Sequence, residues 1–257
     1  MKTLFVTFGC SWTYGVGVGY QSGMPPKDYE KIAWQSEIIN LHSFRGLLSA
    51  KFGLDNRNFA HGGSSNQRQF RLAKIFFTSE EFRDLQKQYD KIIVLHAITS
   101  TARTELFSNE TNQLVNFKFD RDKSKLSECY VKYSYNHKNE IHQLALEMTF
   151  WNEFYRAKNI KNIWVDTFNT HEYPCQIDNL FHAENTQSRD LLSQLAMSNG
   201  LSDLDGKYHL SSWNLDSNRV SFLLKKGIIN PHSMHPTRLG HEQITELLSD
   251  SIKKLLS

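Results

Sequence analysis

Short apolar runs that alternate with amphipathic segments are the feature that most limits how this chain can fold. Residues Thr3–Phe8 and Asp90–Ala97 form nearly continuous apolar runs, the pattern of strands buried in a parallel sheet. Apolar residues recur at helical spacing around 35–52, 66–77, 140–158 and 240–256. Strands that alternate with helices imply β-α-β crossovers, and these require a parallel sheet. We therefore predict an α/β fold, with further short strands at 58–60 and 162–166.

The organisation of the chain favours one domain over residues 1–257. A single α/β domain of about 250 residues is common, and the sequence has no internal repeat and no Pro/Ser-rich linker. The stretch at 108–139 is polar and aromatic without a clear period, and we expect an irregular insertion there. The stretch at 171–230 is expected to be irregular with local helix. Both are long enough to form the walls of a pocket.

Composition excludes several kinds of protein. The chain has 30 Lys and Arg against 27 Asp and Glu, a net charge of +3, so bulk charge gives no reason to expect nucleic acid. No apolar run approaches the roughly 18–20 residues of a membrane span, and the first residues lack the long apolar region of a signal peptide. The three cysteines are far apart and form no Cys-x-x-Cys pair. We expect a cytoplasmic protein that has no cofactor.

Three polar segments follow predicted strands or precede the last helix. They are Gly9-Cys10-Ser11-Trp12-Thr13-Tyr14-Gly15, the 58–68 segment with Gly62-Gly63-Ser64-Ser65-Asn66, and the 234–241 segment with His235-Pro236 and Gly240-His241. Ligands of an open α/β sheet bind outside the carboxyl ends of its strands. The first segment can expose the Ser11 hydroxyl in a tight turn, the second can offer backbone N–H groups to an oxyanion, and the third can project a histidine.

Together the three segments resemble the SGNH (GDSL-like) hydrolase family. In that family a Gly-x-Ser block lies near the N-terminus, a glycine follows the second strand, an asparagine follows the third, and an Asp-x-x-His block precedes the last helix. Three of these positions are matched in order by Ser11, Gly63 and His235. The Gly-Cys-Ser-x-Thr and Gly-Gly-Ser-Ser-Asn blocks resemble those of a subfamily of phage and bacterial proteins. The resemblance implies a three-layer α/β/α fold with a flavodoxin-like parallel sheet.

The activity that the resemblance implies is ester hydrolysis at a Ser-His centre. Ser11 would attack the ester carbonyl, and His235 would accept its proton and return it to the leaving alcohol. The N–H groups of Ser11 and Gly63 would hold the oxyanion. The substrate would be a small ester or an acylated sugar, for example the acetyl ester of a carbohydrate, with no membrane and no nucleic acid as partner.

The chain departs from the family pattern at two positions. His232 stands where the family has the aspartate of its triad, and a neutral histidine lacks the charge that stabilises an imidazolium. Asp166, at the end of a predicted strand, is a candidate substitute. No Gly-x-Asn follows the third strand, so Thr99 or Ser100 falls where the oxyanion asparagine would be, and Asn66 could replace it.

Side chains beside these segments are candidate substrate contacts. Arg68 and Arg103 could each bind a carboxylate or phosphate, or simply lie exposed. Trp12 and Tyr14 could stack on a sugar or acyl group, or pack in the core.

Two other readings remain open. A metal site could be formed by His232, His235 and His241, together with Asp166 or His171. We nevertheless predict that the protein binds no metal. The loss of the family's Asp and Asn could instead mark a catalytically inactive SGNH fold. Such a chain would act as a carbohydrate-binding module or a phage structural module, associated with virions.

Overall fold

A computed structural model describes residues 1–119, 124–181, 189–201 and 218–257. Its centre is a parallel sheet in the order β2-β1-β3-β6. The strands are β1 (Thr3–Phe8), β2 (Asp55–Asn58), β3 (Lys91–Ile98) and β6 (Lys161–Asp166). All residues of β1 are buried, as a strand covered on both faces requires.

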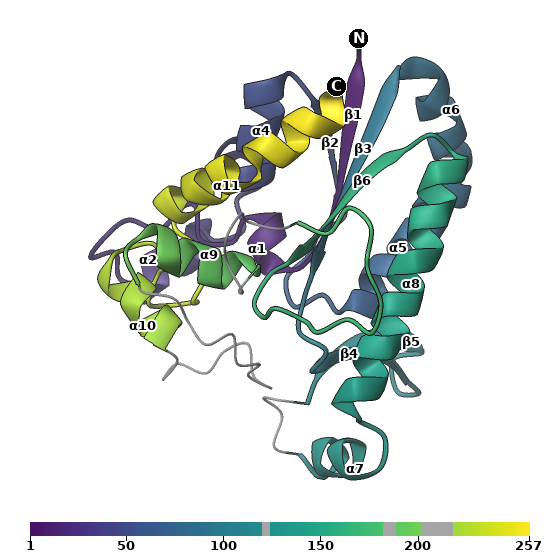
Figure 1. Ribbon diagram of the computed structural model, residues 1–257. Helices are drawn as coiled ribbons and strands as arrows, with labels where there is room; N and C mark the ends of the chain where they lie inside the picture. Colours follow the sequence, from purple (N-terminus) through teal and green to yellow (C-terminus); the bar gives the residue numbers. More distant parts are fainter. Residues whose placement is uncertain (120–123, 182–188, 202–217) are drawn as a thin grey trace.

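Helices cover both faces of this sheet (Figure 1). The C-terminal helix α11 and α4 lie on one face with α9, and α5, α6 and α8 lie on the other. The predicted three-layer α/β/α fold with a parallel sheet is thereby confirmed. The helices of the two faces are α4 (Phe44–Phe52), α9 (Leu191–Ser198), α11 (Arg238–Leu256), α5 (Asn66–Thr78), α6 (Glu80–Gln88) and α8 (His137–Ala157).

Side-chain caps set the starts of several helices. Ser65 accepts a hydrogen bond from the N–H of Arg68 and caps α5, and Ser79 caps α6 in the same way. The helix expected over 35–52 is divided at Ser43, whose backbone is extended and whose hydroxyl caps α4. The remaining helices are α1 (Ser11–Tyr14), α2 (Pro26–Ile32), α3 (Ser36–His42), α7 (Lys125–Tyr133) and α10 (Asn218–Lys225).

The segment expected to be an irregular insertion contains regular structure instead. An antiparallel hairpin, β4 (Arg103–Ser108) with β5 (Gln113–Lys118), is followed by α7. The hairpin packs Phe117 and Phe119 against aromatic side chains of α7 and the residues after it, including Tyr130 and Tyr135. This small separate core explains why the aromatic residues there follow no helical period. Much of the 171–230 segment lies outside the described residues.

The core has two apolar clusters, one on each face of the sheet. His96 of β3 lies inside the second cluster, stacked between Phe8 and Trp164, with Nε2 2.7 Å from the Tyr155 hydroxyl. Burial lowers the pKa of His96 to about 3, so this histidine is neutral. Among the described residues, no helix is long and apolar enough to cross a membrane.

Candidate active site

Ser11 is the first residue of α1, immediately after the central strand β1. The turn is tight, because a Cβ on Gly9 would lie 2.1 Å from Thr13 Oγ1. The side chain and backbone of Ser11 are only 6% exposed. Its Oγ makes no hydrogen bond to any described residue. At the start of a helix the Ser11 N–H has no intrahelical acceptor. The hydroxyl and this N–H are therefore available to a ligand.

The Gly63 loop lies beside Ser11 because β2 pairs with β1. The N–H of Phe59 donates to the Thr7 carbonyl at 2.8 Å, and the N–H of His61 donates to the Gly9 carbonyl at 3.2 Å. Gly63 follows with a φ of +74°, which favours glycine. No described residue accepts a hydrogen bond from its N–H. This N–H is a second donor at the same edge of the sheet.

His235 lies in the loop before α11, which packs against the loop after α1. A Cβ on Gly17 would lie 3.0 Å from His235 Cβ and 2.1 Å from the Pro236 carbonyl oxygen. His235 is thus placed beside the segment that carries Ser11. No hydrogen bond joins Ser11 Oγ to the His235 ring in the described structure. Such contacts commonly form only when substrate is bound.

Asn230 holds the His235 loop, and our sequence reasoning missed it. Its Oδ1 accepts from the N–H groups of His232 and Ser233, and its Nδ2 donates to the His235 carbonyl at 3.1 Å. Ser233 also contacts the Tyr29 hydroxyl at 2.8 Å. An Asn-Pro pair favours turn initiation, so the sequence Asn230-Pro231 was the available signal.

His232 is held away from the role that its position suggested. Its Nε2 donates to the Met24 carbonyl at 2.7 Å, and its ring packs against Tyr20 and Tyr29. It makes no hydrogen bond to His235 among the described residues. The ring therefore anchors the loop before α2.

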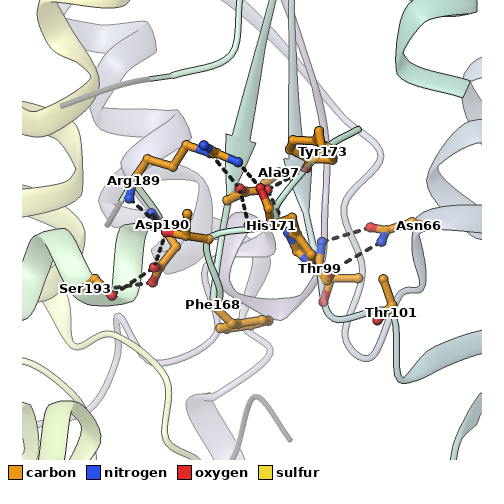
Figure 2. Close-up of polar contacts among 12 residues, drawn as sticks. Asn66, Ala97, Thr99, Thr101, Phe168, His171, Tyr173, Arg189, Asp190 and Ser193 are labelled. Atoms are coloured by element: carbon orange, nitrogen blue, oxygen red, sulfur yellow. Dashed lines mark hydrogen bonds and ion pairs between the residues drawn. The ribbon is translucent and has the colours of Figure 1, made fainter. Parts of the chain in front are cut away.

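The candidate oxyanion donors after β3 are bonded internally. Figure 2 shows Asn66 paired with Thr99: its Nδ2 donates to the Thr99 carbonyl at 3.0 Å, and its Oδ1 accepts from the Thr99 N–H at 2.8 Å. The Thr99 hydroxyl accepts from Arg103 Nη1 at 2.9 Å, and the Ser100 hydroxyl accepts from the Ala102 N–H. These bonds tie α5 to β3 and fix the start of the hairpin.

Asp166 forms a buried pair with His171 instead of with His235. Its oxygens accept from His171 Nδ1 at 2.9 Å, from the Tyr173 hydroxyl at 2.8 Å and from Arg189 Nε at 3.3 Å. Figure 2 shows His171, Tyr173 and Arg189 grouped beside the end of β6. Burial alone would raise the pKa of Asp166. The charge and hydrogen bonds of His171, with the charge of Arg189, outweigh it and lower that pKa.

The other side chains that were candidate substrate contacts are buried or half-buried. Trp12 is buried and packs edge-on against Phe168, so it cannot stack on a ligand. The Arg103 guanidinium is buried 5.3 Å from the centre of the Phe168 ring. Arg68 Nη1 is buried with no hydrogen-bond partner in the described residues, and burial lowers the pKa of Arg68. Tyr14 is half-buried.

The candidate metal ligands do not form one group. His241 is buried behind the loop, and its Nδ1 accepts from the Phe44 N–H at 3.2 Å. Burial lowers the pKa of His241 to about 3. Within the described ranges, no three His, Cys, Asp or Glu side chains are arranged to hold a metal ion.

Comparison with known proteins gives fold-level similarity only. No family model and no curated protein matches the chain. Among solved structures, the chain is similar to the psychrotrophic esterase EstA from Pseudoalteromonas sp., with 13% identity, a TM-score of 0.45, and 100% and 99% of the two chains covered. It is also similar to a putative lipolytic protein of the G-D-S-L family from Desulfitobacterium hafniense, with 10% identity, a TM-score of 0.44, and 97% and 99% coverage. A third similar structure is a Corynascus thermopiles carbohydrate esterase family 2 enzyme, with 12% identity, a TM-score of 0.46, and 99% and 66% coverage.

Proposed function

We propose that the chain is a serine ester hydrolase. The observation that carries the proposal is the meeting of three segments at one edge of the sheet. Ser11 follows β1, Gly63 follows the paired strand β2, and Gly17 packs against His235. These segments provide a nucleophile, an oxyanion donor and a base, the three groups that acyl transfer needs.

In this mechanism Ser11 Oγ attacks the ester carbonyl while His235 accepts the hydroxyl proton. The carbonyl oxygen becomes an oxyanion, which the N–H groups of Ser11 and Gly63 stabilise, and each such donor contributes about 3–4 kcal/mol. His235 then gives the proton to the leaving alcohol, and an acyl-Ser11 intermediate remains. Water, deprotonated by His235, releases the acid and restores Ser11.

The substrate in this proposal is a small ester, and the acetyl ester of a carbohydrate is its narrower form. The chemistry needs no cofactor. The buried Asp166–His171 pair takes no part, because its carboxylate is occupied by His171, Tyr173 and Arg189.

The test combines active-site labelling with turnover of acetyl esters. Wild type is expected to be labelled at Ser11 by a fluorophosphonate and to hydrolyse 4-nitrophenyl acetate. The variants Ser11→Ala and His235→Ala are expected to lose turnover while they remain folded by circular dichroism. Equal turnover by wild type and His235→Ala would refute the proposed base.

The second candidate is a binding module on a catalytically inactive hydrolase fold. The observation that favours it is that the Asn66 amide donates to the Thr99 carbonyl and the His232 ring donates to the Met24 carbonyl, so each of these donors already has an internal partner. A wild-type protein that is neither labelled nor active, yet binds carbohydrate, would support this second candidate.

A further inference from the structure

An exposed tryptophan lies against the candidate oxyanion loop. Trp34, just after α2, is 54% exposed, although tryptophan is usually well buried. Its ring packs on Gly62, because a Cβ there would lie 2.6 Å from Trp34 Cη2. Gly62 precedes Gly63, so the ring borders the site at which the oxyanion would form.

Two more rings join Trp34 to the nucleophile. The Tyr14 ring centre lies 5.6 Å from that of Trp34 and 6.4 Å from that of His61. Tyr14 is the last residue of α1, the one-turn helix that begins at Ser11. The three rings, which we call the aromatic platform (Tyr14, Trp34 and His61), therefore join both loops of the candidate site.

We propose that the aromatic platform binds the sugar ring of an acylated carbohydrate, whose ester group then reaches Ser11. This inference rests on the proposed function and names the substrate class of that site. The exposed part of the indole offers an aromatic surface to the apolar C–H face of a pyranose, and the two nearby rings extend that surface.

The polar atoms of the platform match the hydroxyl groups at the edge of a sugar. The Tyr14 hydroxyl makes no hydrogen bond to a described residue. His61 Nδ1 lies 3.0 Å from the Gly62 carbonyl oxygen, which can only accept, so Nδ1 is the donor. In that tautomer Nε2 is the ring atom that can accept a hydrogen bond. A donor-acceptor hydroxyl and an acceptor nitrogen beside an aromatic face suit a neutral polyol.

The activity test compares two acetyl esters that differ in whether they carry a sugar. Trp34→Ala is expected to lower kcat/KM for methyl 2,3,4-tri-O-acetyl-β-xyloside by about tenfold, from the loss of ring stacking. Its kcat/KM for ethyl acetate is expected to fall much less than that for the xyloside, since ethyl acetate has neither a sugar ring nor an aromatic ring to stack on Trp34. Trp34→Phe should restore part of the loss. Phe150→Ala is the control, because it removes a similarly exposed ring on α8, away from the platform. Its kcat/KM should be unchanged for both esters.

A binding test keeps this inference separate from catalysis. In Ser11→Ala protein, methyl β-xyloside is expected to change the intrinsic tryptophan fluorescence, and the double variant with Trp34→Ala should lose that change. Equal losses on both esters in Trp34→Ala, or no loss on either, would overturn the platform. Sugar binding that needs Trp34, in a wild-type protein without esterase activity, would support the platform and refute the hydrolase.

Discussion

The two halves of the sheet's carboxyl edge use their polar groups differently. At the ends of β3 and β6, Asn66, Thr99, Asp166 and His171 are joined by short internal hydrogen bonds. At the ends of β1 and β2, the Ser11 hydroxyl and the Gly63 N–H bond to no described residue. In the first half the named side chains bond to one another, whereas in the second half these two donors are open.

This difference separates groups that hold the fold from groups that can meet a ligand. A buried polar group costs free energy unless it is bonded, so the bonds of Asn66 to Thr99 and of Asp166 to His171 favour one arrangement of their loops. A donor without a protein partner regains that cost when it bonds to water or substrate. We therefore expect changes at β1 and β2 to act on turnover, and changes at β3 and β6 to act on stability.

The largest expected effect is on turnover, at Ser11. Ser11→Ala should lower kcat for 4-nitrophenyl acetate by at least about 10⁴-fold, as removal of a nucleophile does. The midpoint of urea unfolding should be nearly unchanged, because Ser11 Oγ supports no described hydrogen bond. Unchanged turnover would place the nucleophile elsewhere.

The next effect is on stability, at Asp166. Asp166→Asn should destabilise the fold by about 3–5 kcal/mol, because it leaves the Arg189 guanidinium without its buried counter-charge. Urea unfolding measures this, and kcat per folded molecule should change little. Tyr173→Phe removes a single hydrogen bond to the same carboxylate and should cost about 1–2 kcal/mol. A large loss of kcat in Tyr173→Phe would make the network catalytic.

A glycine comparison tests the oxyanion loop. Gly63→Ala should lower kcat roughly 100-fold, because the loop would shift and displace its N–H. Alanine at this position would have an unfavourable positive φ, and its Cβ would lie 2.7 Å from Lys118 Nζ. Gly53→Ala is the matched control: its φ is also positive, at +65°, but nothing lies within 4 Å of the new Cβ. Equal activity in the two variants would remove Gly63 from the mechanism.

The β3–β6 half should also carry a pH signature. The unfolded chain protonates His96 near its usual pKa, whereas the folded protein holds that pKa at about 3. The unfolded state therefore binds more protons below about pH 6.5, and stability should fall as pH drops toward 3. In His96→Phe the slope of unfolding free energy against pH, between pH 6 and 4, should decrease by about 1.4 kcal/mol per pH unit. An unchanged slope in urea titrations at several pH values would contradict this.

The smallest effect should come from His232. His232→Gln can keep a donor for the Met24 carbonyl, so activity and stability should change less than about threefold and about 1 kcal/mol. A loss of activity as large as that of His235→Ala, measured on the same ester, would return His232 to the catalytic group.

The strands β1, β3 and β6 and the helix caps could be predicted from local sequence. The strand expected at 58–60 lies instead at Asp55–Asn58, and neither the β4–β5 hairpin nor the side-chain partners could be predicted. Thr3–Phe8 and the Ser65 cap depend on residues within a few positions of one another, and the structure has both. The pairing of Asp166 with His171, and of Asn66 with Thr99, depends on how loops turn after their strands. His96 shows the same limit, since its burial comes from rings on β1 and β6. Trp34 shows it too, because its contact with Gly62 joins distant segments.

The contact of Gly17 with His235 and Pro236 has a consequence for how activity arises during synthesis. The candidate nucleophile, Ser11, is synthesised long before the candidate base, His235. A chain still on the ribosome can complete the central strands and yet lack its base. Ester turnover would then report that the segment around His235 has docked, and it would distinguish molecules that carry this segment from truncated ones that share the same sheet.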